Sequence, residues 1–288
     1  MTGTAYGILV GYDGSASSEQ ALRWAAREAL SRGTALTVCH AFGPGFPVPP
    51  GEEGVVDLAR RSGERAIVGG LRQAQHLMGT GKVRSLLVAG SAAAVLCGRS
   101  HDAAMVVVGA RGLGGVAGLR LGSVGSQVAA HASGRVVVVR GHWRPAAGFV
   151  PGPILVGADG SRPSRDALDL AFEEAMLRKA PVLAVCALAD APDSLGGADK
   201  LREQFEDAIS RREKNHPEVA VLRRLSHGGA RDALLTAAHD AQLLVVGARG
   251  RGGIAGMPLG SVSLAALHHA PCPVGVARPA PPPDMKPT

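Results

Sequence analysis

Four small residues at fixed spacing form the most informative pattern in the chain: Gly109-x2-Gly112-x9-Gly122-Ser123, the first glycine motif. It follows directly after a run of apolar residues that is typical of a buried strand. Glycine permits positive φ and lets the backbone approach a ligand closely, so consecutive N–H groups after a strand can surround an oxyanion. A helix that begins at the end of the motif would add its partial positive charge. The pattern therefore predicts a site for an anionic ligand, and for phosphate in particular.

The chain contains this unit twice. The second glycine motif, 138 residues later, is Gly247-x2-Gly250-x9-Gly260-Ser261. A second pair of segments, each of the form Gly-x-Asp-Gly-Ser after an apolar run, repeats at an offset of 146 residues, from Val10 to Ser15 and from Val156 to Ser161. The second copy is therefore 8 residues shorter between these landmarks. We assign the extra length of the first copy to a Gly/Pro-rich loop from Gly43 to Gly54.

Each copy alternates short Val/Leu/Ile runs with longer amphipathic segments, which is typical of a parallel sheet with helices on both faces. We predict an α/β, Rossmann-like fold of two tandem, doubly wound, five-stranded sheets with strand order 3-2-1-4-5. Ligands of such sheets bind beyond the carboxyl ends of the strands, where the strand order reverses. This order would bring Asp13 beside the first glycine motif and Asp159 beside the second. The predicted strands span residues 7–12, 35–40, 83–89, 104–109 and 135–140, then 153–158, 181–187, 219–225, 243–247 and 274–277.

Local signals set the helix starts and the domain limits. Ser15 and Ser161 are each placed to cap the helix that follows the first strand of a copy. Two prolines and two glycines within 142–152 mark the boundary between the copies. We therefore predict domains at 1–145 and 150–280, and a disordered, proline-rich tail at 281–288.

Composition narrows the possible functions. The chain has 288 residues, 46% apolar and 19% charged, which suits two globular domains. Its apolar runs fall short of the roughly 20 residues that span a membrane, and no cleavable signal is evident, so we expect a cytoplasmic protein without a membrane partner. A net charge of +7 would suit nucleic acid, but with two Trp, two Tyr and five Phe, and no basic run interleaved with them, that partner is disfavoured. The charge instead favours a small anionic ligand.

The two paired motifs together resemble the ATP-binding branch of the universal stress protein family. The resemblance covers both copies and includes the segment from Gly260 to Val274, which is similar to that family's last helix and strand. It implies one ATP site per domain, with each Asp near the adenosine and the metal, the glycines along the phosphates, and Mg²⁺ bound with ATP. The residues that the resemblance implies for binding are Gly11, Asp13, Gly109, Gly112, Leu121, Gly122, Ser123 and Val124, then Gly157, Asp159, Gly247, Gly250, Leu259, Gly260, Ser261 and Val262.

The same resemblance implies a regulatory role. Such a protein would act as a nucleotide-dependent sensor or regulator in the stress response and would meet an unidentified protein partner. Its two domains would pair within one chain through Val136 to Val139 and Val274 to Val276, and a homodimer is also possible.

Simpler explanations of these residues stay open. The glycines also suit tight strand-to-helix turns, Asp13 and Asp159 suit turns in which Asp accepts local N–H groups, and the two motif serines suit helix N-caps. Arg120 stands where the second copy has Pro258, and it suits a phosphate contact as well as a place in solvent.

No catalytic set is evident in the sequence. No His/Cys cluster has zinc-ligand spacing, no histidine is assigned a catalytic role, and we expect the four cysteines to be buried structural thiols. Arg111 and Arg249 lie inside the glycine motifs and can supply charge, but no candidate base accompanies them, so we expect ATP binding with little or no hydrolysis. The alternatives are a nucleotide-independent, stress-linked interaction module and an ATP-using enzyme such as a slow ATPase or a nucleotidyl transferase.

Overall fold

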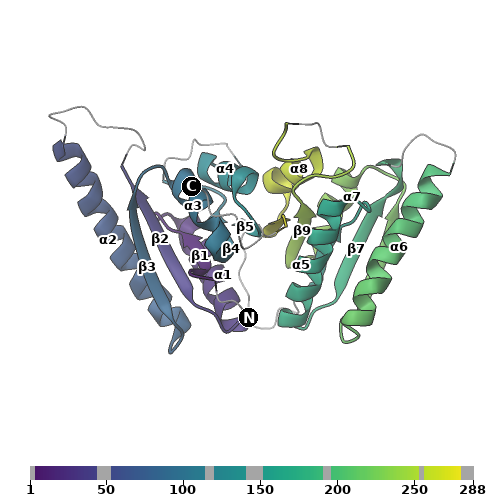
Figure 1. Ribbon diagram of the computed structural model, residues 1–288, viewed down its shortest axis with the longest axis horizontal. Coiled ribbons are helices and arrows are strands. Elements are labelled where there is room, and N and C mark those ends of the chain that lie inside the picture. Colours follow the sequence, from purple (N-terminus) through teal and green to yellow (C-terminus); the bar gives the residue numbers. More distant parts are fainter. Residues whose placement is uncertain are drawn as a thin grey trace. The chain divides into compact units, whose positions relative to one another are not determined.

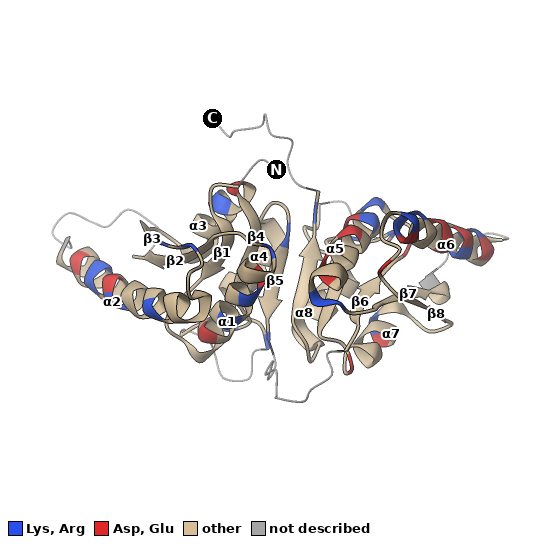
Figure 2. Ribbon diagram, turned by 90° about the horizontal axis from the view of Figure 1, so that it is seen from below, with Lys and Arg blue, Asp and Glu red and all other residues tan. Residues whose placement is uncertain are grey.

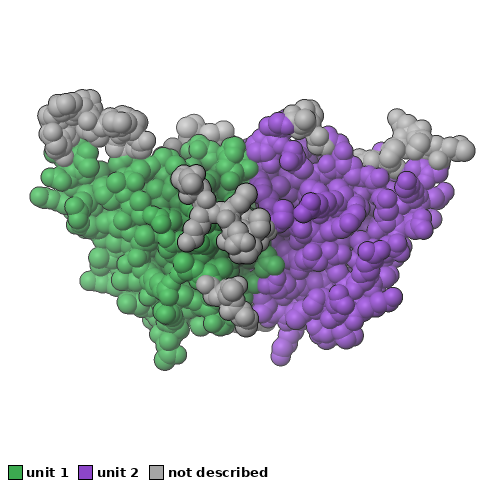
Figure 3. Space-filling model, viewed as in Figure 1, with its two compact units in different colours: residues 1–140, 280–288 green, residues 141–279 purple. Residues whose placement is uncertain are grey.

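The computed structural model describes residues 4–43, 53–113, 120–140, 152–190, 196–252 and 256–279. They belong to two compact units, unit 1 within Met1–Arg140 and unit 2 within Gly141–Pro279 (Figure 3). The predicted domain limits near 145 and 150 and the predicted disorder of 281–288 fall outside the described residues, so they stay predictions.

Unit 1 is a parallel sheet covered by helices (Figure 1). Its elements are β1 (Gly7–Gly11), α1 (Ala16–Ser31), β2 (Leu36–Phe42), α2 (Glu53–Met78), β3 (Val83–Ala89), α3 (Ala92–Arg99), a short 3-10 turn η1 (Ser100–Asp102), β4 (Ala103–Gly109), α4 (Ser123–His131) and β5 (Val136–Val139). The strands pair in the order β3-β2-β1-β4-β5, and every pairing is parallel. Because crossovers between parallel strands are right-handed, α1 and α2 cover one face and α3 and α4 the other; α1 contacts α2, and α3 contacts α4. The chain reverses direction across the sheet between β1 and β4.

Unit 2 repeats this plan. Its elements are β6 (Ile154–Gly157), α5 (Arg162–Arg178), β7 (Val182–Ala187), a short 3-10 turn η2 (Leu188–Asp190), α6 (Gly197–Asn215), β8 (Val221–Ser226), α7 (Ala230–Ala237), β9 (Leu243–Gly247), α8 (Ser261–His269) and β10 (Val274–Ala277). Its strands pair in parallel in the order β8-β7-β6-β9-β10. The predicted fold class and the order 3-2-1-4-5 are thus confirmed in each unit, and each strand limit lies within two residues of its predicted place.

The strands are continuous apolar runs because they are buried on both faces. Ile8 to Val10 of β1 and Val136 to Val139 of β5 are 0% exposed. Charged residues lie mainly on the helices, as the colouring of α5 and α6 shows (Figure 2). The two predicted caps are confirmed: Ser15 accepts the N–H of Ser18 at 3.2 Å, and Ser161 accepts that of Ser164 at 3.3 Å.

Helix α2 has 26 residues and its counterpart α6 has 19. The predicted loop from Gly43 to Gly54, to which we assign the extra length of the first copy, lies mostly outside the described residues, so that assignment stays a prediction. Several glycines within α2 argue against a helix on propensity alone. Burial of Ile67, Ala74 and Met78 along one face of α2 compensates for that low propensity.

Candidate functional site

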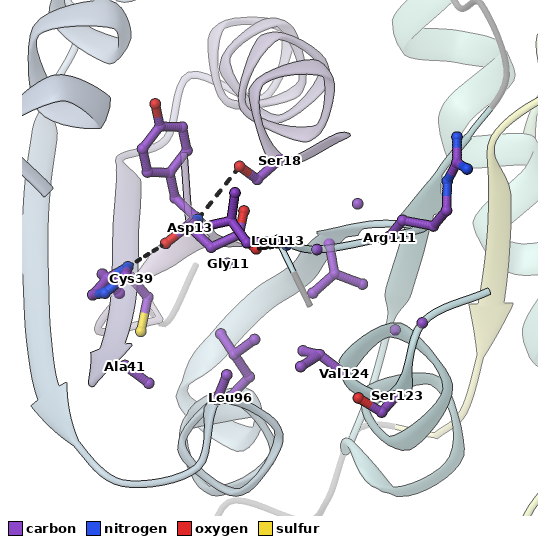
Figure 4. Close-up of a pocket in the computed structure, with 18 residues that line it drawn as sticks. Gly11, Asp13, Ser18, Cys39, Ala41, Leu96, Arg111, Leu113, Ser123 and Val124 are labelled. Carbon is purple, nitrogen blue, oxygen red and sulfur yellow. Dashed lines mark hydrogen bonds between the residues drawn. The ribbon is translucent and has the colours of Figure 1, made fainter. Parts of the chain in front are cut away.

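A pocket lies in unit 1 at the carboxyl ends of the strands, where their order reverses (Figure 4). It has a volume of about 480 Å³. Its walls are the ends of β1, β2 and β4, one side of α3 and the first turn of α4. The residues that line it are Gly11, Tyr12, Asp13, Ser18, Cys39, His40, Ala41, Ala92, Leu96, Val108, Gly109, Arg111, Gly112, Leu113, Gly122, Ser123, Val124 and Gly125. Seven of the eight residues predicted for this unit line the pocket; the eighth, Leu121, is buried in the core instead.

Asp13 ties the two halves of this site together. Its Oδ1 accepts the N–H of Ser15 at 3.0 Å, within its own turn, and its Oδ2 accepts the N–H of Leu113 at 3.0 Å, within the first glycine motif. Burial by itself would raise the pKa of this carboxyl, but the hydrogen bonds from Ser15, Leu113 and Ser18 outweigh burial, so the pKa is lowered. Asp13 is therefore a charged group that fixes the loop beside β1.

Unit 2 has the equivalent pair of hydrogen bonds. Asp159 Oδ1 accepts the N–H of Ser161 at 3.0 Å, and Oδ2 accepts the N–H of Arg251 at 2.9 Å. The turn interpretation of the two Asp residues is correct for one oxygen of each. The other oxygen, however, holds a loop about a hundred residues away in the sequence, which a local turn residue would not do.

Two glycines of each motif are required by close packing. A Cβ added at Gly112 or Gly250 would lie 2.7 Å from Oδ2 of the Asp in its unit. Added at Gly109, it would lie 2.7 Å from the backbone of Ser17, and added at Gly247, 2.6 Å from that of Pro163. These glycines let the strand end and the loop approach the first helix and its Asp, so the tight-turn interpretation accounts for them without a ligand.

The third glycine of each motif has no such explanation. Gly122 and Gly260 are the N-caps of α4 and α8, with φ of −81° and −79°, which any residue can adopt. Among the described residues, a Cβ added at Gly122 would come no closer than 3.5 Å to another atom, and one added at Gly260 no closer than 3.4 Å. Neither N-cap provides a side-chain hydrogen bond. The fold tolerates a side chain at both positions, yet both helices begin with an uncapped glycine.

This uncapped start matters because the first-turn N–H groups of a helix have no partner within the helix. In α4 they belong to Ser123, Val124 and Gly125, and all three residues line the pocket. Figure 4 shows Ser123 and Val124 across the pocket from Asp13. In unit 2, Ser261 and Val262 begin α8 in the same way, and Leu259 is buried like Leu121.

Sequence reasoning missed the side of the pocket formed by the end of β2 and by α3. Cys39, His40 and Ala41 belong to β2, and Ala92 and Leu96 to α3. The three β2 residues could have been predicted from the strand order 3-2-1-4-5, because this order puts the end of β2 next to Asp13. The two α3 residues had no sequence signal, because helix packing decides which side chains face the pocket.

Two polar groups of this missed side, Cys39 and His40, are held in defined states. The pKa of the Cys39 thiol is raised to about 12 by burial, so the thiol stays protonated and inert. His40 Nδ1 lies 2.8 Å from the carbonyl oxygen of Tyr12, and since a carbonyl only accepts, Nδ1 carries the proton. Cys39, Cys186 and Cys272 are buried, as predicted, whereas Cys97 is only partly buried.

The arginines of the first glycine motif do not point into the pocket. Arg111 donates its backbone N–H to Ser17 Oγ at 3.1 Å, and its guanidinium points away from Asp13 (Figure 4). Arg120, at the far end of the motif, is exposed.

The described residues do not provide a cation cage. Among them no group of three or more His, Cys, Asp or Glu side chains could hold a metal ion, and both Asp13 oxygens already accept backbone N–H groups. The predicted Mg²⁺ therefore lacks a protein-built site in the described part of the chain.

No helix among the described residues is long and apolar enough to cross a membrane.

Known proteins share both the sequence and the fold. The model of the universal stress protein family matches residues 7–140 and 152–278. A universal stress protein of Mycolicibacterium smegmatis is 37% identical over 296 residues, covering 97% of this chain and 99% of its own. One of Mycobacterium tuberculosis (strain H37Rv) is 35% identical over 291 residues, covering 96% and 97%. The chain belongs to the universal stress protein family.

A solved structure agrees on the fold. The crystal structure of a universal stress protein from Archaeoglobus fulgidus superimposes with a TM-score of 0.74 at 18% identity, covering 96% of this chain and 99% of the other. At that identity the likeness concerns the α/β architecture, with its mostly parallel sheet and flanking helices.

Proposed function

We propose that the chain binds ATP at the strand ends of each unit and acts as a nucleotide-dependent regulator that hydrolyses ATP little or not at all. The observation that carries this proposal is the uncapped start of α4, which faces a pocket of about 480 Å³. That volume is within the usual range for small-molecule sites. Three N–H groups and the positive end of a helix dipole favour a phosphate group there.

The rest of the pocket suits the nucleoside. Ala41, Leu96 and Val108 supply apolar contact area between the Asp13 turn and α3. The lone pairs of Asp13 that the loop leaves unused would accept ribose hydroxyls, and the backbone of β2 would meet the base. Mg²⁺ would be held by the phosphates and water, as is usual for this ion with nucleotides.

The side chains available support a proposal of binding without efficient turnover. A hydrolase needs a group that orients or deprotonates the attacking water. Of the titratable residues that line the pocket, Asp13 is engaged by backbone N–H groups, the Cys39 thiol is inert, and burial raises the pKa of Tyr12. His40 donates Nδ1–H to the Tyr12 carbonyl, and its Nε2 lies on the side of Gly63 of α2. None of these groups is placed as a base beside the start of α4.

Family membership alone supports three further parts of the proposal. The domains would pair within the chain through Val136 to Val139 and Val274 to Val276, with a homodimer as the next level of assembly. The protein would work in the cytoplasm. A protein partner would read the nucleotide-bound state.

The test is to purify the protein, denature it and identify the released nucleotide by mass spectrometry and chromatography. We expect ATP, up to two per chain after incubation with Mg-ATP, and loss of this ATP from a Gly122→Val, Gly260→Val double variant. Valine suits the extended φ and ψ of both positions, so the variant should fold. Turnover by the purified protein that exceeds the double variant would favour the enzyme alternative. No ATP bound even after incubation would refute the proposal and favour a nucleotide-independent module.

A further inference from the structure

The two candidate sites differ at one equivalent position of the glycine motif. Leu113 in unit 1 and Arg251 in unit 2 both follow the second glycine of their motif, and both donate their backbone N–H to the Asp carboxylate of their unit. Leu113 lines the unit 1 pocket. The Arg251 side chain instead donates from Nη1 to the carbonyl oxygen of Asp159 at 3.1 Å and to Oε1 of Gln204 at 3.0 Å. Arg251, Gln204 and the Asp159 carbonyl form what we call the Arg251 strap.

The strap joins the glycine motif and the Asp159 turn to α6. Gln204, on α6, lies close against that turn: a Cβ added at Gly160 would be 2.9 Å from its Oε1 and 3.2 Å from its Cβ. For the equivalent glycine of unit 1, Gly14, no atom of the described residues lies within 4 Å of an added Cβ. Helix α6 therefore touches the Asp turn of unit 2, whereas that turn in unit 1 has open space at the same point.

A bound phosphate would compete for the strap. Both oxygens that hold the Arg251 guanidinium are neutral, whereas a phosphate is charged and can accept two parallel N–H groups from one guanidinium, which adds Coulombic attraction and a better geometric fit. The start of α8 is within easy reach, because a Cβ added at its N-cap Gly260 would lie 3.6 Å from the N of Gly250, the residue before Arg251. The Arg251 side chain is exposed and is not held by burial.

We propose that phosphate bound at the start of α8 draws Arg251 away from Gln204 and the Asp159 carbonyl, and so loosens α6 from the Asp159 turn. This inference rests on the proposed function. It identifies α6 as the element whose mobility changes when a nucleotide binds to unit 2. Leu201, Phe205 and Ile209 keep α6 docked, since all three are fully buried. The change is therefore a local loosening around Gln204. In unit 1, the Leu113 side chain has no hydrogen-bond donor and cannot form the equivalent of the Arg251 strap. Nucleotide binding in unit 1 should therefore leave the mobility of α2 unchanged by this route.

Hydrogen–deuterium exchange of the full chain, read by mass spectrometry, tests both the strap and its release. Without ligand, Arg251→Leu, which installs the unit 1 residue, and Gln204→Ala should each raise exchange in peptides covering 197–205 by about fivefold, because each removes the hydrogen bond between the Arg251 guanidinium and Gln204. The control is Arg202→Leu, which removes the same charge from an exposed position on α6 and leaves the strap intact. With saturating Mg-ATP, the wild-type peptides should reach the rate of Arg251→Leu, while that variant and the α2 peptides should show no rise.

Calorimetry on the same samples separates the two possible failures. If ATP binds to unit 2 of the wild type but exchange in 197–205 stays constant or slows, the release is wrong although the binding function stands. If neither strap variant exchanges faster than Arg202→Leu without ligand, the strap does not hold α6 and the inference falls. If no ATP binds to unit 2 in a Gly122→Val background, the proposed function fails there, and the coupling fails with it.

Discussion

The two units have the same arrangement of Asp, glycine motif and helix start, but different residues pack around it. In both, the Asp carboxylate holds the glycine motif with a hydrogen bond of 2.9–3.0 Å, and in both the following helix starts at an uncapped glycine. The residues behind the Asp turn differ: Tyr12 and His40 in unit 1 correspond to Ala158 and Cys186 in unit 2. The comparison indicates that loop geometry and helix start are the common requirement, and that the surroundings can vary.

The differences between the units are paired. In unit 1, a Cβ added at Gly70 of α2 would lie 2.8 Å from the Tyr12 ring, and one added at Gly63 would lie 2.9 Å from the His40 ring. The offset of 138 that relates β3 to β8 makes Gly70 equivalent to Ala208 and Gly63 to Leu201. Larger strand residues thus face glycines on the helix in unit 1, and the equivalent positions of unit 2 combine smaller strand residues, Ala158 and Cys186, with larger helix residues, Ala208 and Leu201. This exchange of volumes explains glycines in α2 that its helix propensity would not favour.

The largest expected effect on the free energy of unfolding comes from substitution of the glycines that close packing requires. Gly109→Ala in unit 1 and Gly247→Ala in unit 2 should each lower the free energy of unfolding by about 3 kcal/mol, because the new Cβ meets backbone that cannot move away easily. Gly122→Ala, which meets no atom within 3.4 Å, should change stability by less than about 0.5 kcal/mol. Urea unfolding followed by circular dichroism measures both; equal losses at 109 and 122 would contradict this division.

The paired packing of unit 1 makes a double-mutant cycle informative. Gly70→Ala should lower the free energy of unfolding by about 2 kcal/mol, because the methyl group collides with Tyr12. In a Tyr12→Ala background, which reproduces the residue of unit 2, the same substitution should be nearly neutral. A coupling energy of about 1–2 kcal/mol is expected from thermal or urea unfolding of the four proteins. Additive effects would mean that the volumes are not exchanged between strand and helix.

Asp13 gives unit 1 a dependence on pH. Its pKa is lowered in the folded state, because the hydrogen bonds to the carboxylate outweigh the effect of burial. The stability that it contributes is therefore fully present above its unfolded pKa, near 4, and is lost as the pH falls through the lower folded pKa. Asp13→Asn should cost about 1–2 kcal/mol at pH 7 and reduce the loss of stability in acid. Urea midpoints measured from pH 7 downward would show this, and an unchanged acid dependence would argue against the role.

The smallest effects should be equal in the two units. Ser15→Ala and Ser161→Ala each remove one N-cap hydrogen bond of similar length, 3.2 and 3.3 Å. Each should lower the free energy of unfolding by about 1 kcal/mol. A difference larger than that value between the two variants, in unfolding midpoints at equal m-values, would show that the first helices are not equivalent.

Most of the fold was predictable from the sequence, because buried strands appear as apolar runs and the repeat shows each element twice. The Asp–glycine pairing also followed, since the predicted strand order puts Asp13 beside the first glycine motif. The length of α2 did not follow, because burial of Ile67, Ala74 and Met78 stabilises a helix whose glycines give it a low propensity. The engagement of Arg251 with Gln204 was equally hidden, since it depends on how closely α6 approaches the Asp159 turn.

The most direct test of the central claim is a calorimetric titration of the full chain with Mg-ATP, together with Gly122→Val and Gly260→Val as single variants. If each unit binds at its uncapped helix start, the wild type binds two ATP, and each variant loses one while keeping its circular dichroism spectrum and its unfolding midpoint. Retention of two sites in both variants would place the ligand elsewhere and contradict the account.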